Sequence, residues 1–117
     1  MNTATTPSFN QLKRSFLNSG YEIRSLSRHT LEGMALDAPY EAKRHQSSNI
    51  MGLILPDENV IALAEDLSVD EKAATLLHEI IHLQHPDMAE DDVEGLTVEI
   101  EESLTPAQFG FLQFLVS

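Results

Sequence analysis

Three histidines and a glutamate stand close together in the stretch ATLLHEIIHLQHPDMAEDDVEGL, residues 74–96. His78 and His82 are four residues apart, and Glu79 follows the first of them. At about 100° per residue both imidazoles lie on one face of a helix, about one turn apart. Such a pair can bind one ion, and zinc suits it because zinc needs no redox change and leaves a coordination position for water. Glu79 would take a proton from that water and return it to the leaving amine.

The predicted helix divides into an apolar and a polar arc, and the histidines belong to the polar one. We therefore expect them to face outward, onto solvent or onto a cleft. His-Glu-x-x-His arises by chance in about one chain of this length in a few hundred. The mid-helix position of the motif, with an acidic helix directly after it, favours a metal site over ordinary exposed side chains.

A zinc ion with an open position needs a third protein ligand. His85 is about 10 Å along the helix axis from His78, so we interpret it as a C-terminal cap or part of a cleft wall. Residues 87–90 fit a capping box, which would account for Glu90. If the chain doubles back after His85, Glu94 lies level with the histidine pair. Glu94 is the predicted third ligand, and Glu90 stays open as the alternative because helical geometry permits either.

The elements that must position these residues follow from periodicity, turns and caps. Tyr21, Ile23 and Leu26 alternate as in a strand, whereas residues 30–40 show no clear period. The sequence predicts one α+β domain over residues 1–117, with a small sheet packed on the helix that carries the motif. The expected elements are an N-terminal helix within 1–20, a β-hairpin at 50–64, a motif helix at 68–85, an acidic helix at 87–104 and a C-terminal segment at 105–117.

Composition narrows the classes of function. The chain has 117 residues and a net charge of −12, and most of its acidic residues follow residue 56. An acidic C-terminal half repels phosphates, which argues against nucleic-acid binding. No apolar run is long enough to span a bilayer and the N-terminus has no secretory signal, so the expected location is the cytoplasm. Cysteine is absent, which excludes disulfides and thiolate ligands.

The segments TLLHEIIH and HPDMAEDDVEGL resemble the gluzincin metallopeptidases, most closely the minigluzincins and related small phage-type zinc peptidase domains. The resemblance covers mainly residues 50–104. It implies a minimal zincin-like fold in which His78, His82 and Glu94 bind zinc and Glu79 is the general base and acid. In the family an Asp or Asn often follows the ligand glutamate by four residues, but Val98 stands there in this chain. If Glu90 were the ligand, Glu94 would occupy that second position.

Larger members of that family also supply a Tyr or His, from beyond the glutamate, for the developing oxyanion. No Tyr, His, Lys or Arg follows His85 here. Any such donor must come from upstream, and the candidates are Tyr21, His29, Tyr40 and His45.

The leading hypothesis is a zinc-dependent peptidase acting on a peptide or protein, with residues 60–64 as an edge strand that an extended peptide can join. A latent form is also open, in which the aromatic segment 105–117 fills the cleft, although core packing is the favoured role for those aromatics. The alternative from a different class is a non-catalytic zinc-binding module that regulates or binds another protein.

Overall fold

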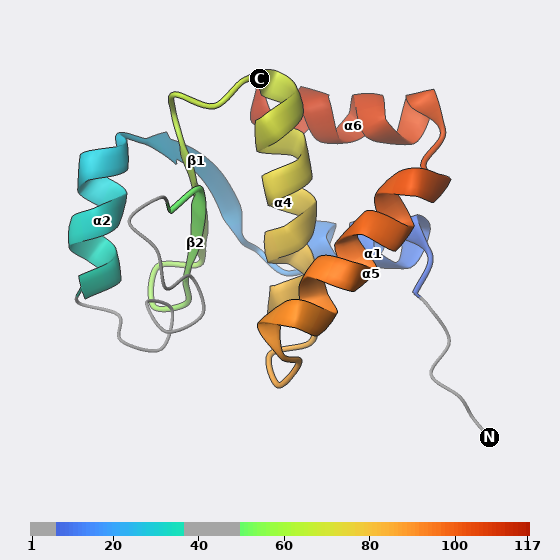
Figure 1. The fold of residues 1–117 in the computed structure, drawn as a ribbon, viewed down its shortest axis with the longest axis horizontal. Coiled ribbons are helices and arrows are strands. Elements are labelled where there is room, and N and C mark those ends of the chain that lie inside the picture. The colour runs from blue at the N-terminus through green and yellow to red at the C-terminus, as the bar shows by residue number, and fades with distance from the viewer. Residues whose placement is uncertain (1–6, 37–49) are drawn as a thin grey trace.

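The computed structural model describes residues 7–36 and 50–117, which form a mixed α/β structure of five helices and one small sheet (Figure 1). This arrangement is consistent with the α+β class predicted from the sequence. In chain order the elements are α1 (Phe9–Leu17), β1 (Glu22–Leu26), α2 (Arg28–Leu36), β2 (Gly52–Leu55), β3 (Val60–Ala64), α4 (Val69–Gln84), α5 (Glu90–Ser103) and α6 (Pro106–Val116).

The sheet has the order β1-β3-β2, with β1 parallel and β2 antiparallel to β3. The turn between β2 and β3 closes with Asn59 at a φ of 55°, a left-handed conformation that asparagine tolerates better than most residues. Because β3 is paired on both sides, the expectation that residues 60–64 form an edge is wrong. Among the described strands the edges are β1 and β2.

Alternating side chains of β2 and β3 enter two different cores. Ile54, Ile61 and Leu63 pack into a larger core with α1, α4, α5 and α6. Leu53 and Val60 belong to a smaller core on the opposite face, which includes Leu31 of α2. A strand turns successive side chains to opposite faces, so both sets are buried only because helices cover both sides of the sheet.

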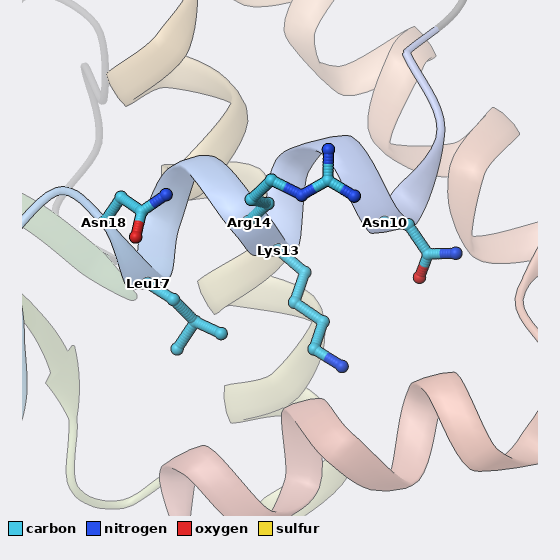
Figure 2. A pocket seen from close by; sticks show the side chains of 5 residues that line it. All are labelled: Asn10, Lys13, Arg14, Leu17 and Asn18. Atoms are coloured by element: carbon cyan, nitrogen blue, oxygen red, sulfur yellow. The ribbon is translucent and has the colours of Figure 1, made fainter.

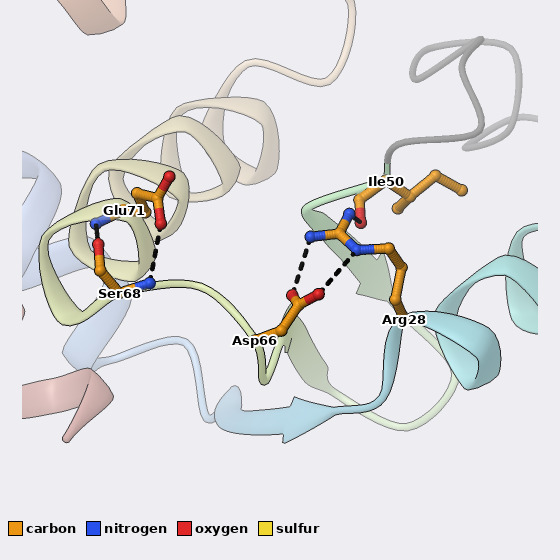
Figure 3. Close-up of polar contacts among 5 residues, drawn as sticks. All are labelled: Arg28, Ile50, Asp66, Ser68 and Glu71. Atoms are coloured by element: carbon orange, nitrogen blue, oxygen red, sulfur yellow. Dashed lines mark hydrogen bonds and ion pairs between the residues drawn. The ribbon is translucent and has the colours of Figure 1, made fainter.

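Helix α4 lies against the sheet and packs on β2 and β3 (Figure 1). Ser68 caps it: the Ser68 hydroxyl accepts from the backbone N–H of Glu71, and the Glu71 carboxylate accepts from the backbone N–H of Ser68 (Figure 3). This reciprocal box satisfies donors that a helix start leaves unpaired. Pro86 cannot continue the helix, and the last helical residue is Gln84.

Two further helices complete the layers. Helix α2 occupies part of the segment for which the sequence predicts no element, and the buried Leu31 anchors it to the sheet. Helix α6 packs on α4 and buries Leu112 and Val116, so the C-terminal aromatic segment contributes to the larger core. In the described part of the chain, no helix has the length and apolar character needed to cross a membrane.

Candidate metal centre

Helix α4 carries all three residues of the His-Glu-x-x-His motif. His78 and His82 are one turn apart, and their rings pack edge to face with centroids 4.8 Å apart. Glu79 lies on the same helix and its side chain is almost completely buried. The motif thus sits in the last two turns of a helix that is fixed at its start by the Ser68 cap.

The position of the next helix decides which acid reaches the histidines. Helix α5 begins at Glu90, its N-cap is Ala89, and no side chain caps it. The capping box predicted over residues 87–90 is therefore wrong. A turn in which the backbone N–H of Met88 donates to the carbonyl of His85 connects the two helices. Glu90 is consequently the first helical residue, and its carboxylate is available to side chains of α4.

Glu90 contacts both histidines. Its Oε1 lies 2.6 Å from Nε2 of His82, and its Oε2 lies 3.2 Å from Nε2 of His78. One donor atom from each of the three residues lies within 4.8 Å of the others, so the group can hold a metal ion. Two imidazole nitrogens and one carboxylate oxygen are a ligand set that suits zinc and leaves a fourth tetrahedral position open.

Glu94 is one turn further along α5 and is exposed. It does not belong to the His/His/Glu group that the described residues form, and Glu90, the alternative left open by the sequence, occupies that place. The sequence interpretation assigned Glu90 to a cap and so placed the helix start three residues too early. His85 is the C-cap of α4, where its backbone N–H donates to the carbonyl of Ile81, and it is also outside the group.

The histidines do not face outward as the division into two arcs predicted. The side chain of His82 is 0% exposed and that of His78 is 16% exposed. Helix α5 packs on α4 and carries the Glu90 carboxylate onto its polar arc. A helical wheel separates two faces of a helix but does not show whether a neighbouring helix covers the polar one.

Glu79 lies against the first residue of the edge strand β2. Gly52 is so close that a Cβ placed on it would lie 3.1 Å from Oε2 and 3.3 Å from Cγ of Glu79. Thr75, one turn before Glu79 on α4, has its methyl group next to the same glycine. The buried carboxyl group is thus enclosed between its own helix and the backbone of β2.

A second carboxyl group of α5 interacts with the site electrostatically. Burial raises the pKa of Glu101, and the charge of His78 acts in the opposite direction. His78 therefore acts on the Glu101 carboxyl group through its charge, against the larger effect of burial.

Two of the four upstream oxyanion candidates, Tyr21 and His29, lie in the described part of the chain. Tyr21 packs against the larger core, and His29 is exposed on α2. Tyr40 and His45 lie outside the described residues.

An open surface pocket of about 360 Å³ lies elsewhere, along α1, and is lined by Asn10, Lys13, Arg14, Leu17 and Asn18 (Figure 2). Its lining is basic and includes no residue of the motif. Lys13 also places its ammonium group 4.4 Å from the ring centre of Phe111 on α6. This cation–π contact links α1 to α6.

No protein-family model matches the chain, and neither the curated proteins nor the solved structures include a significant match.

Proposed function

We propose that this chain is a zinc-dependent peptidase of the gluzincin type, with zinc held by His78, His82 and Glu90. The observation that carries the proposal is the convergence of these three side chains beside a fourth, Glu79, that is buried one residue from a ligand. A structural ion pair needs only two of these groups. Two imidazoles, one carboxylate and an adjacent carboxyl group are the set that hydrolysis of an amide requires.

Zinc at this position would lower the pKa of a coordinated water and polarise the substrate carbonyl. Glu79 would take the proton from the attacking water and deliver it to the leaving amine, because its carboxyl group is adjacent to the ligand set. Glu90 would neutralise part of the metal charge as the third ligand, in place of the contacts that it makes with the two histidines in the metal-free protein.

The placement of β2 supports a peptide substrate. β2 is an edge of the sheet among the described strands, and its first residue touches Glu79. An extended peptide that pairs with this edge would pass beside the proposed base. The proposed binding edge is therefore β2, in place of the residues 60–64 expected from the sequence.

The zincin-like fold is part of the same proposal. A small sheet, a motif helix packed on it and a following helix that brings a glutamate to the motif are the parts that such a fold needs. The mixed α/β arrangement described above contains each of them.

The test is Glu79→Gln, with the exposed Glu94→Gln as the matched control. We expect Glu79→Gln to keep one zinc per chain and to cut peptide hydrolysis by about 10²- to 10⁴-fold, the contribution typical of general acid–base catalysis. Glu94→Gln should change neither. Zinc is measured by calorimetric titration of the metal-free protein, and hydrolysis by mass spectrometry on a mixture of peptides of varied sequence.

Two results would contradict the proposal in different ways. A wild-type protein that binds no zinc, or that binds it equally well after His78→Ala and His82→Ala, ends the metal assignment. A wild type that binds zinc through these residues but cleaves no peptide favours the non-catalytic zinc-binding module.

A further inference from the structure

Gly52 of β2 lies next to the side chain of the proposed base, Glu79. It is buried at the start of β2, and the position that a Cβ would occupy faces α4. A Cβ at this position would meet Thr75 Cγ2 at 2.8 Å and the Glu79 side chain at 3.1 and 3.3 Å. The φ of Gly52 is not in the left-handed region, so the backbone conformation does not require glycine. The need for glycine comes from the space next to Thr75 and Glu79.

The chain just before this glycine is held in place by two hydrogen bonds. The guanidinium of Arg28 donates to the carbonyl of Ile50 at 2.7 Å and also binds the carboxylate of Asp66 (Figure 3). The backbone N–H of Ala64 donates to the carbonyl of Met51 at 2.8 Å. Two consecutive carbonyl groups just before Gly52 are therefore fixed, which limits how far the strand can move away from α4.

We propose that Gly52 is a positioning residue that sets where the Glu79 carboxyl group lies relative to the two histidines. Any side chain at position 52 would enter the space that Oε2 and Cγ of Glu79 use. Since the strand is anchored, the carboxyl group at the end of a flexible side chain is the part that moves. The catalytic consequence rests on the proposed function, whereas the position of the carboxyl group does not.

A displaced base has a specific kinetic result. Misplacement of a reacting group by about 1 Å can cost about 10²-fold in rate. Contacts of 3.1 and 3.3 Å require the Glu79 side chain to give by a few tenths of an ångström. Gly52→Ala is therefore expected to lower kcat by about 2- to 10-fold and to leave KM within about 2-fold, because the base acts in the chemical step. Zinc affinity should stay within about 3-fold, because the close contacts of Gly52 are with Thr75 and Glu79 and not with the ligands.

If Gly52 had a purely structural role, kcat would follow the stability of the fold. A second substitution, at Thr75, separates this role from the positioning of Glu79. Thr75→Ser removes the methyl group that makes the 2.8 Å contact but leaves both contacts with Glu79. In Gly52→Ala/Thr75→Ser we expect the melting temperature to return toward that of Thr75→Ser while kcat stays low. Recovery of kcat together with the melting temperature would overturn the proposal. Gly95→Ala is the matched control, because its Cβ meets nothing within 4 Å, and it should leave kcat unchanged.

Crystal structures of wild type and Gly52→Ala give a readout that needs no substrate. The proposal requires the Glu79 carboxyl group to shift relative to the His78 and His82 rings while β2 keeps its pairing with β3. An unmoved carboxyl group, or a strand that moves instead, overturns it. If the wild type cleaves no peptide, the proposed function fails, and the crystallographic comparison still decides whether Gly52 positions Glu79.

Discussion

The polar groups on the two faces of the sheet differ in their burial and in their partners. On the face covered by α4, a large core is accompanied by a largely covered cluster in which Glu90 contacts the partly exposed His78 and the buried His82. On the face covered by α2, a smaller core is accompanied by a pair of charges, Arg28 and Asp66, in which the Asp66 side chain is 58% exposed. Both sites join a cationic or potentially cationic group to a carboxylate.

The two sites differ in burial, and their contacts therefore contribute differently to the stability of the fold. Groups removed from water must keep their partners, because an uncompensated buried polar group costs far more than the contact contributes. An exposed ion pair is screened by solvent and contributes little. The cluster of His78, His82 and Glu90 is largely covered and has one member more than an ion pair needs. It is therefore the better candidate for a functional site.

Removal of α6 should have the largest effect, because it opens the core on the α4 side. Truncation after Leu104 exposes the surfaces that Leu112 and Val116 cover, and burial of such side chains contributes about 1.5–3 kcal/mol each. The partly buried Phe109, Phe111 and Leu115 are lost as well. The combined loss is comparable to the free energy of unfolding of a small domain, about 5–15 kcal/mol, so we expect the truncated chain not to fold. Circular dichroism and thermal unfolding measure this.

The matched control is Phe114→Ala, since this α6 side chain is 76% exposed. It should change the free energy of unfolding by less than about 0.5 kcal/mol. A truncated chain that folds and hydrolyses peptide faster than the full chain would instead support the latent enzyme, with the C-terminal segment acting as the inhibitor.

Glu90→Ala tests the buried cluster and should have the second-largest effect. In the metal-free protein it leaves His82 without its carboxylate partner, at a cost of about 1–3 kcal/mol. With zinc present the difference grows: ligand at 100 times its Kd stabilises the wild type by about 2.7 kcal/mol. We expect zinc to raise the melting temperature of the wild type and not that of Glu90→Ala.

Glu94→Ala provides the comparison for that experiment, because Glu94 is exposed on the same helix. Zinc should stabilise this variant as it stabilises the wild type. The reverse result, in which Glu94→Ala loses the zinc response and Glu90→Ala keeps it, would restore the ligand predicted from the sequence.

Asp66→Asn on the α2 side should have the smallest effect, and its sign depends on pH. The hydrogen bond from Arg28 lowers the pKa of Asp66 below its ordinary value of 3.8. The pair therefore stabilises the fold above pH 3.8, and the contribution is lost as the pH falls through the lowered pKa of the native state. In urea denaturation we expect a small drop in the midpoint of Asp66→Asn at pH 7 that is smaller at pH 2, because the pair loses its contribution progressively below pH 3.8.

Asp57→Asn, on the exposed turn between β2 and β3, is the control for the loss of one negative charge. A midpoint difference between wild type and Asp66→Asn that is the same at both pH values would show that Arg28 does not stabilise the fold through the ionised carboxylate.

Local features of this chain were readable from the sequence, since each depends on neighbours a few residues away. The Ser68 cap, the stop before Pro86, the β2–β3 turn and the shared face of His78 and His82 follow from backbone geometry and side-chain chemistry within one or two turns. Helix α2 was not predicted, because residues 30–40 show no clear period in the sequence, and in the structure the buried Leu31 packs it on the sheet.

Residue types and their spacing are enough to predict the chemistry of the motif: two imidazoles on one helical face, a carboxyl group beside them and acids soon afterwards. Packing between helices and strands brings Glu90 to the histidines, covers them with α5 and places Gly52 of β2 against Glu79. These outcomes depend on where α5 begins and how the strands are ordered. Both are set by packing between segments distant in the chain, which no local pattern records.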